Sequence, residues 1–450
     1  MKIKSLHLKN FRCFDDFNIE FEDQMTVIVA ENGKGKTAIL DAVAIAVGPY
    51  ITCFNGGKNR SLEDDDVRQS QEAAAGGQMR ILRMKSYYPI ELEVVGQLGE
   101  KTCTWQRELQ AQGGRTTVRR AKCLTDYGQG LKKMINSDHD MECVLPVIAY
   151  YGTTRMWQDS KLLTNNKDKI NLERDSGYAE CLEPSSSYNT FGQWFKYASL
   201  STLEYDRYLE ETGSTEPNPY REVLKAVSQS IETCVGSMGW KNIDYSVASQ
   251  SLVISKEHVG TLPLKALSDG VRSVISMAAD IAYRMARLNP DLGAEVTQKT
   301  PGIVLIDEVE MHLHPSWQQV VLADLQKAFP LVQFIVTTHS PQVLTSVDSN
   351  SIRVLRWAES KIDIYCPEFS LGAESYQLLK DIQNVDTRPQ ALPIVQDLSR
   401  YLALVSEDKW DSEEAVLLRK RLDAWARGRE PALLRADLDI RMRAFHRHKQ

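Results

Sequence analysis

The chain has 450 residues, of which 42% are hydrophobic and 25% are charged, and its formal net charge is -6. This length suffices for two or three lobes with large cores, since a domain takes roughly 100 to 200 residues. The acidic balance argues against a uniformly basic coat for nucleic acid, and no apolar run approaches the roughly 20 residues of a membrane helix. Scattered cysteines and a charged start without signal-peptide features, Met1-Lys2-Ile3-Lys4, lead us to expect a cytoplasmic protein without membrane contact.

The first 30 residues predict antiparallel strands that lead into a buried strand. Residues 17–22 alternate apolar and polar side chains, whereas Val27-Ile28-Val29 is wholly apolar. The segment AENGKGKT, residues 30–37, follows this apolar run and precedes a helical pattern that begins near residue 38. A buried strand, a glycine-rich turn and a helix in this order are typical of a phosphate-binding loop.

The loop matches the pattern G-x-x-x-x-G-K-[ST] except at its first position, which is Ala30. Lys36 would contact the phosphates and Thr37 would bring its hydroxyl to Mg²⁺. A left-handed backbone at Ala30 would cost roughly 1 kcal/mol, which a triphosphate site tolerates. We therefore predict a site for ATP and Mg²⁺ that is formed by Asn32, Gly33, Lys34, Gly35, Lys36, Thr37 and Ala38.

The middle of the chain changes character twice. Residues 55–78 predict a loop, in which the acidic run 63–66 is expected to be solvated. Residues 156–240 lose the strand pattern and predict an inserted helical lobe with Trp157, Trp194 and Phe195 in its core. Between these two segments, strands are predicted over residues 89–95, 102–109 and 144–151.

The second half of the chain predicts a βαβ unit within a parallel sheet. A hairpin is expected near residues 243–255 and a helix over 267–288. Two short apolar runs, 302–306 and 333–336, then flank a predicted helix at 317–328. Because the carboxyl ends of parallel strands meet at the ligand crevice, the residues after these runs are candidates for chemistry.

Both runs lead to side chains that suit phosphoryl transfer. Asp307 would bind Mg²⁺, and Glu308 would act as the base on the attacking water. His339 would contact the γ-phosphate and hold that water. Ser268 and Gly270 open the helix at 267–288 and predict a second anion site, since a helix N-terminus attracts phosphate. Each residue alone would more often be structural, so the interpretation depends on their combination.

In this order, the phosphate loop, the L-S-D-G-x-R helix start and the two strand ends resemble the ABC ATPases of the SMC and RecF kind. Over the whole chain the sequence is similar to the bacterial AAA ATPase family of PtuA in the Septu anti-phage system. The similarity is carried by residues 149–155 (AYYGTTR), 288–290 (LNP), 312–315 (HLHP) and 338–341 (THSP). It implies an α/β, ABC-type P-loop NTPase head, whose mixed sheet has central parallel strands, with an inserted helical lobe and a helical C-terminal tail.

The resemblance also implies a division of the chain and a set of partners. Two heads would dimerise head to tail, so that ATP on Lys36, Thr37, Asp307 and Glu308 of one subunit is capped by Ser268 and Gly270 of the other. Larger homo-oligomers, a separate PtuB-like HNH nuclease subunit and DNA are the expected partners. The implied domains are an ATPase lobe at 1–155, the inserted lobe at 156–240, a second ATPase lobe with the signature and the His switch at 241–365, and a helical interaction region at 366–450.

Several alternatives remain open at this point. The chain would otherwise be a RecF-like repair ATPase that binds DNA ends or gaps, or a stand-alone ATP-dependent endonuclease. Arg155 either reaches the nucleotide or a partner or is an ordinary surface arginine, and Gln69 and Gln71 lie where a metal-contacting glutamine of a cassette would fall. Asp437-Leu438-Asp439 is expected to be helix surface rather than a Toprim carboxylate pair, because the other carboxylates of such a site are missing.

Overall fold

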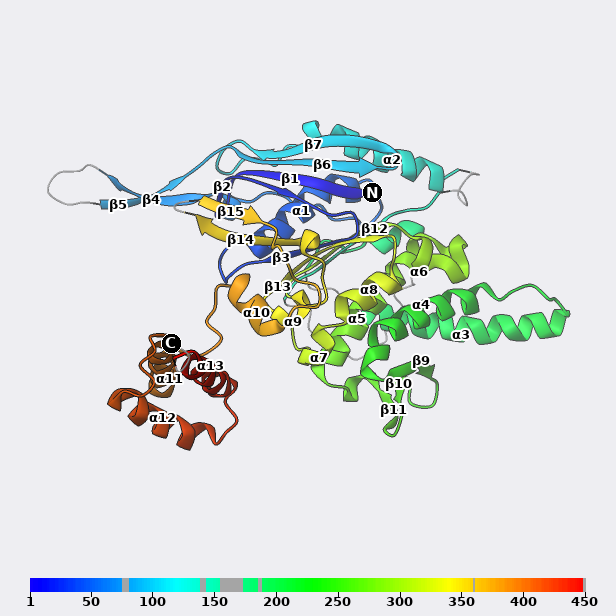
Figure 1. Cartoon of the computed structure of the whole chain (residues 1–450). Coiled ribbons are helices and arrows are strands. Elements are labelled where there is room, and N and C mark those ends of the chain that lie inside the picture. Colours follow the sequence, from blue (N-terminus) through cyan, green and yellow to red (C-terminus); the bar gives the residue numbers. More distant parts are fainter. Residues whose placement is uncertain (75–80, 138–142, 154–172, 185–187, 359–360, 448–450) are drawn as a thin grey trace. The chain divides into compact units, whose positions relative to one another are not determined.

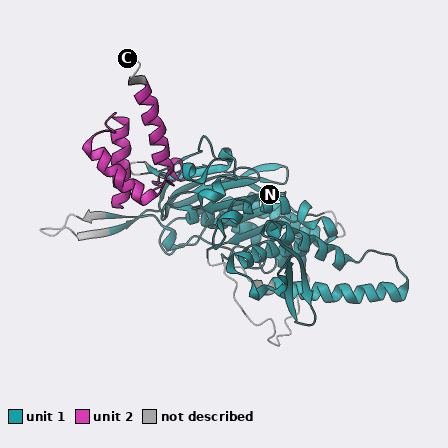
Figure 2. Ribbon diagram, turned by 60° about the horizontal axis from the view of Figure 1, so that its bottom comes forward, with its two compact units in different colours: residues 1–378 teal, residues 379–450 magenta. Residues whose placement is uncertain are grey.

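The computed structural model describes residues 1–450 apart from 75–80, 138–142, 154–172, 185–187, 359–360 and 448–450. Arg155 and Trp157 therefore lie outside the described residues. The chain divides into two compact units, Met1–Leu378 and Leu379–Gln450 (Figure 2). Among the helices described, none combines the length and the apolarity that crossing a bilayer requires.

A six-stranded mixed sheet forms the centre of the first unit (Figure 1). Its order is β15-β14-β3-β13-β12-β8, in which β14 to β8 pair in parallel and only the edge strand β15 is antiparallel. This arrangement confirms the predicted class, an ABC-type P-loop head with central parallel strands. The strands are β3 (Met25–Val29), β8 (Val147–Tyr151), β12 (Gly302–Ile306), β13 (Val332–Thr338), β14 (Ile352–Ala358) and β15 (Lys361–Tyr365).

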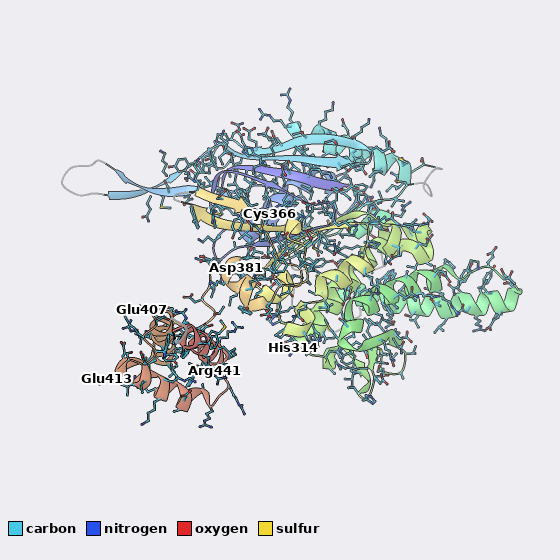
Figure 3. All side chains as sticks on the ribbon, viewed as in Figure 1. His314, Cys366, Asp381, Glu407, Glu413 and Arg441 are labelled. Carbon is cyan, nitrogen blue, oxygen red and sulfur yellow. The ribbon has the colours of Figure 1, made fainter. Side chains whose placement is uncertain are left out.

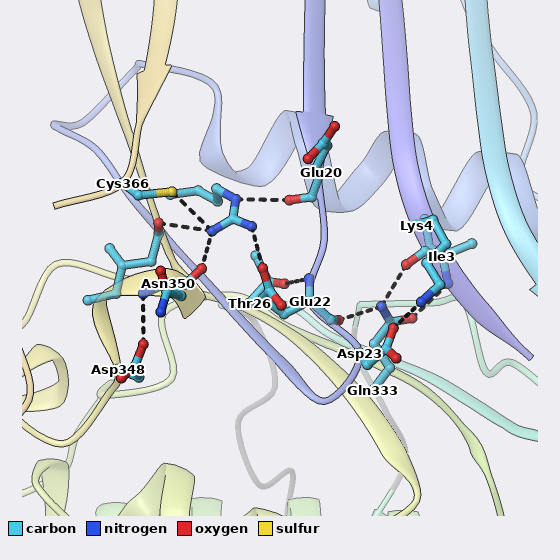
Figure 4. Close-up of polar contacts among 12 residues, drawn as sticks. Ile3, Lys4, Glu20, Glu22, Asp23, Thr26, Gln333, Asp348, Asn350 and Cys366 are labelled. Carbon is cyan, nitrogen blue, oxygen red and sulfur yellow. Dashed lines mark hydrogen bonds and ion pairs between the residues drawn. The ribbon is translucent and has the colours of Figure 1, made fainter. Parts of the chain in front are cut away.

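A second, antiparallel sheet has the order β2-β1-β6-β7. Gln333 of β13 ties it to the central sheet, because its side chain bonds the N–H and the carbonyl of Ile3, each at 2.7 Å, and the carbonyl of Glu22 at 2.8 Å (Figure 4). Arg353 of β14 adds bonds to the Glu20 carbonyl and the Glu22 carboxylate. The strands are β1 (Lys2–Phe11), β2 (Phe14–Glu20), β6 (Ile90–Leu98) and β7 (Lys101–Leu109).

Helix α1 (Lys36–Ile51) follows the phosphate loop and is buried along nearly all of its length. An α-helix that is apolar all round is a core helix, and α1 contacts β6 and β7 of one sheet and β12 and β13 of the other. Its last turns are fixed by side chains of β7: the Trp105 indole donates to the Ala46 carbonyl at 3.0 Å and the Arg107 guanidinium to the Ile45 carbonyl at 2.8 Å. The helix that starts at the phosphate loop is thereby held rigidly.

The segment predicted as an inserted helical lobe, residues 156–240, is largely helical where the structure describes it. Trp194 and Phe195 are buried there, and the Trp194 ring lies 5.4 Å from that of Tyr283. The predicted hairpin is present as β9 and β10, and a third strand, β11, joins it. Other elements of the first unit are α2 (Lys122–Ile135), which lies against α1 and β7, α3 (Tyr188–Thr212), α4 (Pro219–Val235), β9 (Trp240–Ser246), β10 (Ser251–Lys256), β11 (Gly260–Pro263), α5 (Asp269–Leu288), α6 (Val296–Lys299), α7 (Pro315–Gln318), α8 (Val321–Ala328), α9 (Pro341–Leu344) and the first residues of α10 (Ser375–Asp381).

The second unit contains α11 (Pro393–Ser406), α12 (Glu413–Ala426) and α13 (Pro431–Arg447). These helices share a core that includes Leu398, Tyr401 and Leu422. Asp437 lies on α13 and forms an ion pair with Arg419 of α12. The expectation that residues 437–439 are helix surface is therefore confirmed.

Three local expectations were wrong, and one helix was missed. The acidic run is not wholly solvated, because Asp66 is buried against Arg12, whose Nε donates to it at 2.8 Å. The loop predicted at 55–78 includes β4 (Gln69–Ala74), which pairs with β5 (Ile81–Ser86) in a projecting hairpin (Figure 1). Its polar and alanine-rich sequence lacks the β-branched residues that signal a strand. The helix predicted at 317–328 is two helices, α7 and α8, and α2 was not anticipated.

Candidate nucleotide site

The phosphate loop joins β3 to α1 and has the backbone that a cradle needs. Gly33 and Gly35 have φ of 76° and 90°, which glycine adopts without steric cost. A Cβ at Gly35 would also meet the Phe14 ring at 2.5 Å and the Cys13 sulfur at 2.7 Å, so only glycine fits there. Ala30 is not among the described residues with positive φ, and the strain expected at this position is absent.

Lys36 reaches back across the loop. Its ammonium donates to the carbonyls of Ala30 at 2.9 Å and Glu31 at 3.3 Å. Burial lowers the pKa of Lys36 from its ordinary value, while the negative charges of Asp307, Glu308 and Glu310 oppose that shift. The ammonium therefore lies in the field of three carboxylates that come from the end of β12 and the turn after it.

Asp307 joins the loop to β12 and β13. Its carboxylate accepts from the Thr37 hydroxyl at 2.8 Å and from the Thr337 hydroxyl at 2.5 Å. Thr337 in turn accepts from the Glu308 backbone N–H at 2.8 Å. A magnesium triphosphate requires a cationic donor and oxygen ligands, which the Lys36 ammonium, the Thr37 hydroxyl and the buried Asp307 carboxylate provide.

Glu308 adopts a left-handed backbone with φ of 48°, which is uncommon for a residue with a side chain. Its N–H bond to Thr337 and the bond of the Val309 N–H to the Thr337 carbonyl, at 3.0 Å, fix this turn. Strain of this kind concentrates at functional sites. The left-handed turn thus supports the prediction that Glu308 has a functional role.

His339 follows β13 and is positioned by a residue that the sequence interpretation missed. Glu310 accepts from the His339 backbone N–H at 2.5 Å and from the Thr338 hydroxyl at 2.7 Å. Burial, followed by the charge of Lys36, lowers the pKa of His339, and the carboxylates of Glu310, Glu308 and Asp307 oppose this. The imidazole is therefore neutral at pH 7, and Glu310 would have been recognisable only as the first acidic residue after the D-E pair.

The structure thus brings Lys36, Thr37, Asp307, Glu308 and His339 together from two ends of the chain. Ser268 and Gly270 are not joined to this cluster by any hydrogen bond among the described residues. Ser268 is the N-cap residue of α5, but its hydroxyl makes no capping bond to the helix. A Cβ at Gly270 would lie 2.3 Å from the His312 carbonyl oxygen, so this glycine lets the start of α5 pack against the loop after Glu308.

A second set of residues beside the loop was also missed. Arg12 donates to Asp41 of α1 at 2.6 Å as well as to Asp66, and Asp41 accepts from Arg60 and Tyr150, each at 2.8 Å. This buried network clamps the second turn of the phosphate-loop helix. Arginine-rich charge networks give no periodic signal in a sequence, which explains why it was not anticipated.

Arg12 also lines a cavity of about 190 Å³ next to the loop. The cavity is bounded by the β1–β2 turn, by Gln69 and by the half-exposed ring of Trp357, over which the Lys34 ammonium lies at 6.0 Å from the ring centroid. Gln69 therefore lines this cavity, whereas Gln71 is exposed. A flat aromatic ring beside a phosphate loop is suited to stack on a base.

Comparisons with known proteins match the segments of the chain that carry this site. The family model of an AAA domain matches residues 5–212, and the model of an AAA ATPase domain matches residues 161–344. The matches include the phosphate loop in the first case and the D-E strand end and His339 in the second.

Two relatives extend over almost the whole chain. The retron Ec83 probable ATPase of Escherichia coli is 25% identical over 99% of this chain and 88% of its own length. The retron Vc95 probable ATPase of Vibrio cholerae serotype O1 biovar El Tor is 24% identical over 93% of this chain and 86% of its own. Septu protein PtuA of Bacillus mycoides (strain KBAB4) matches more locally, with 41% identity over 20% of this chain and 12% of its own.

Among solved structures, the SMC head domain from Thermotoga maritima covers 82% of this chain and 100% of its own with 17% identity and a TM-score of 0.42. An SMC head bound to the C-winged helix domain of ScpA is 15% identical, with a TM-score of 0.46, and the match covers 82% of this chain and 98% of that chain.

RecF proteins also match short segments of the sequence. The RecF protein of Bacillus cytotoxicus (strain DSM 22905 / CIP 110041 / 391-98 / NVH 391-98) is 42% identical over 10% of this chain and 12% of its own. The chain is thus similar to AAA-type ATPase domains over residues 5–344, to the retron probable ATPases over nearly its whole length, and to Septu PtuA and RecF over shorter segments.

Proposed function

We propose that this protein is a Mg²⁺-dependent ATPase that regulates a separate HNH nuclease subunit in cytoplasmic anti-phage defence. The observation that carries the ATPase part is the hydrogen bond from Thr37 to Asp307, with Lys36, Glu308 and His339 around it. Catalysis of phosphoryl transfer is mostly positioning and charge neutralisation, and this cluster offers both.

Each residue takes a defined role in this proposal. Backbone N–H groups of residues 32–38 and the Lys36 ammonium hold the phosphates, while Thr37 and Asp307 hold the metal ion. Bound there, MgATP supplies the phosphoanhydride bond that water cleaves. Glu308 accepts the proton of that water, and neutral His339, held by Glu310, keeps the water in place. The nucleoside lies beside Trp357, because that ring borders the loop on the side of Lys34.

The second half of the site comes from another copy of the chain. We propose that Ser268 and Gly270 cap the nucleotide of the neighbouring subunit in a head-to-tail dimer. The Ser268 hydroxyl makes no bond to its own helix, and the N-terminus of α5 attracts anions. Gly270 packs against the loop that follows Glu308. Closure of the dimer at α5 would therefore shift this loop, and with it the catalytic carboxylate of the same subunit.

The defence role and the nuclease partner rest on the relatives. Similarity to two retron probable ATPases extends over nearly the whole chain, and similarity to Septu PtuA is local. We propose that the nuclease is a separate PtuB-like HNH subunit, that the dimers assemble into larger oligomers, and that the complex acts on DNA. A RecF-like repair role is the second candidate, since RecF proteins match short segments of the chain.

Co-purification from the native operon, followed by a nuclease assay with and without ATP, tests this proposal. We expect an HNH subunit to co-purify and its DNA cleavage to depend on nucleotide. Nucleotide-dependent DNA binding without any nuclease subunit would favour the RecF-like role. Mg²⁺-dependent cleavage by the purified chain alone would instead show a stand-alone endonuclease.

A further inference from the structure

Helix α13 carries a line of large apolar side chains that face solvent. Leu434, Leu438 and Met442 are 53%, 59% and 64% exposed, and Phe445 continues the line at 59%. Residues four apart lie above one another on a helix, so these side chains form one stripe. We call the set Leu434, Leu438 and Met442 the α13 stripe.

The stripe is not part of the core of the second unit. That core takes up another face of α13, on which Leu433 and Ala436 are 3% and 2% exposed. Ile440 packs partly against the same core. The helix therefore has two apolar faces, and contiguous exposed apolar surface marks an interaction site more often than it marks ordinary surface.

The charges beside the stripe are basic. Arg435 follows Leu434 and Arg441 precedes Met442, so one arginine lies on each side of the stripe on a helix with 3.6 residues per turn. Arg441 is labelled in Figure 3. Two acidic residues, Asp437 and Asp439, adjoin Leu438 in sequence. Asp437 is paired with Arg419, so the exposed Asp439 is the acidic residue that stands against Arg435 and Arg441, and the flanks keep a positive balance. Over residues 419–450 there are ten basic and four acidic side chains.

We propose that the α13 stripe binds an amphipathic helix with acidic flanks on a protein partner, which, on the function proposed above, is the nuclease subunit. The stripe spans about 12 Å along the helix, which is the length of two turns of a partner helix. Glutamate or aspartate beside the partner's apolar residues would pair with Arg435 and Arg441. A second copy of α13 is disfavoured as the occupant, because it would bring like charges together.

A synthetic helical peptide tests the surface directly. The peptide carries leucine at the two heptad core positions and glutamate at the flanking positions, and its binding to the full-length protein is measured by fluorescence anisotropy. We expect the double variant Leu438→Glu/Met442→Glu to bind at least about 10-fold more weakly. The matched control is Val416→Glu/Leu417→Glu on α12, where the side chains are 59% and 62% exposed; it should change binding less than about 2-fold.

Charge reversal tests the flanks. The variant Arg435→Glu/Arg441→Glu should lose the glutamate peptide and gain a peptide that carries lysine at the same positions. Wild-type protein that does not bind the glutamate peptide, or stripe variants that bind it like wild type, would overturn the proposal. So would a smaller oligomer of the stripe variant in light scattering, which would make the stripe a self-association surface, or stripe-dependent binding to anionic phospholipid vesicles.

The nuclease subunit separates this proposal from the function it rests on. If that subunit binds wild type and the stripe variant equally, the assignment of the surface is wrong and the defence function stands. If no nuclease subunit binds wild-type protein, the proposed function fails, and the peptide measurement still decides what the stripe recognises.

Discussion

The hydroxyl of Thr37 donates a hydrogen bond of 2.8 Å to the carboxylate of Asp307, although 270 positions separate the two residues. Both side chains are expected ligands of one magnesium ion. Their contact joins the phosphate loop to the end of β12, as a metal site shared by the two segments would require. Thr337 holds the other oxygen of the same carboxylate, so Asp307 has little freedom to turn away.

Replacing Lys36 with alanine removes the ammonium that is expected to contact the phosphates. We expect the dissociation constant of ATP to rise roughly 10- to 100-fold, as for the loss of one hydrogen bond to a charged group. Calorimetry on the purified protein measures this. The control is Lys58→Ala, since Lys58 is 64% exposed and pairs with Glu180. Equal ATP affinity in both variants would show that the loop is not the phosphate cradle.

Replacing Glu308 with glutamine should stop hydrolysis without loosening the site. The backbone bond from residue 308 to Thr337 is independent of the side chain, so the turn is retained. We expect kcat to fall about 100- to 1,000-fold, as for removal of a general base. A dimer that persists with ATP should accumulate in size-exclusion chromatography. Glu295→Gln, in an exposed pair with Lys299, should behave like wild type, and full turnover in Glu308→Gln would remove Glu308 as the base.

Glu310 is expected to be a positioning residue, because its two oxygens hold the His339 N–H and the Thr338 hydroxyl. Glu310→Ala should therefore lower kcat about 10- to 100-fold, while the affinity for ATP changes less than about 3-fold. Glu310→Gln keeps one acceptor oxygen and should retain an intermediate kcat. A purely structural role would instead lower the melting temperature of both variants and leave the kcat of the folded protein unchanged.

Most of the main-sheet strands, and the residues that meet at the candidate site, were predictable, because an apolar strand that ends in a polar pair has a strong local signal. The parts that were missed lack such a signal. Strand β4 is defined by its pairing with β5 and not by its composition, and the Arg12–Asp41–Asp66 network is an arrangement of charges that meet only after folding. Gly270 was predicted as a phosphate contact, yet the space it leaves for the His312 carbonyl could not be foreseen from the sequence.

Trp357 is expected to recognise the base of the nucleotide. Trp357→Ala should raise the dissociation constant of ATP roughly 5-fold or more, since stacking of one base is worth about 1 to 3 kcal/mol. Binding of inorganic tripolyphosphate, which has no base, should not change. The control is Phe369→Ala, an exposed aromatic residue outside the cavity, which should bind both ligands like wild type. A parallel loss of ATP and tripolyphosphate binding would place Trp357 among the supports of the loop.

The pKa of His339 is lowered by burial and by the charge of Lys36, so the imidazole stays neutral at pH values where an ordinary histidine, with a pKa near 6.5, is half protonated. If the neutral form holds the water, the acidic limb of kcat/KM, which reports the free protein, should lie below pH 6.5. The free energy of unfolding should also decrease as the pH falls. Below pH 6.5 the unfolded chain takes up a proton at His339 that the folded protein resists, so the His339 contribution to folding is lost there.

Titration of the His339 ring protons by NMR, assigned with His339→Gln, measures the same pKa without turnover. Glu310→Gln removes a negative charge that raises this pKa, so the titration should move to still lower pH in that variant. A His339 midpoint at or above pH 6.5 would mean that the attraction of the three carboxylates outweighs burial and Lys36, and His339 would then act as a cation in the site.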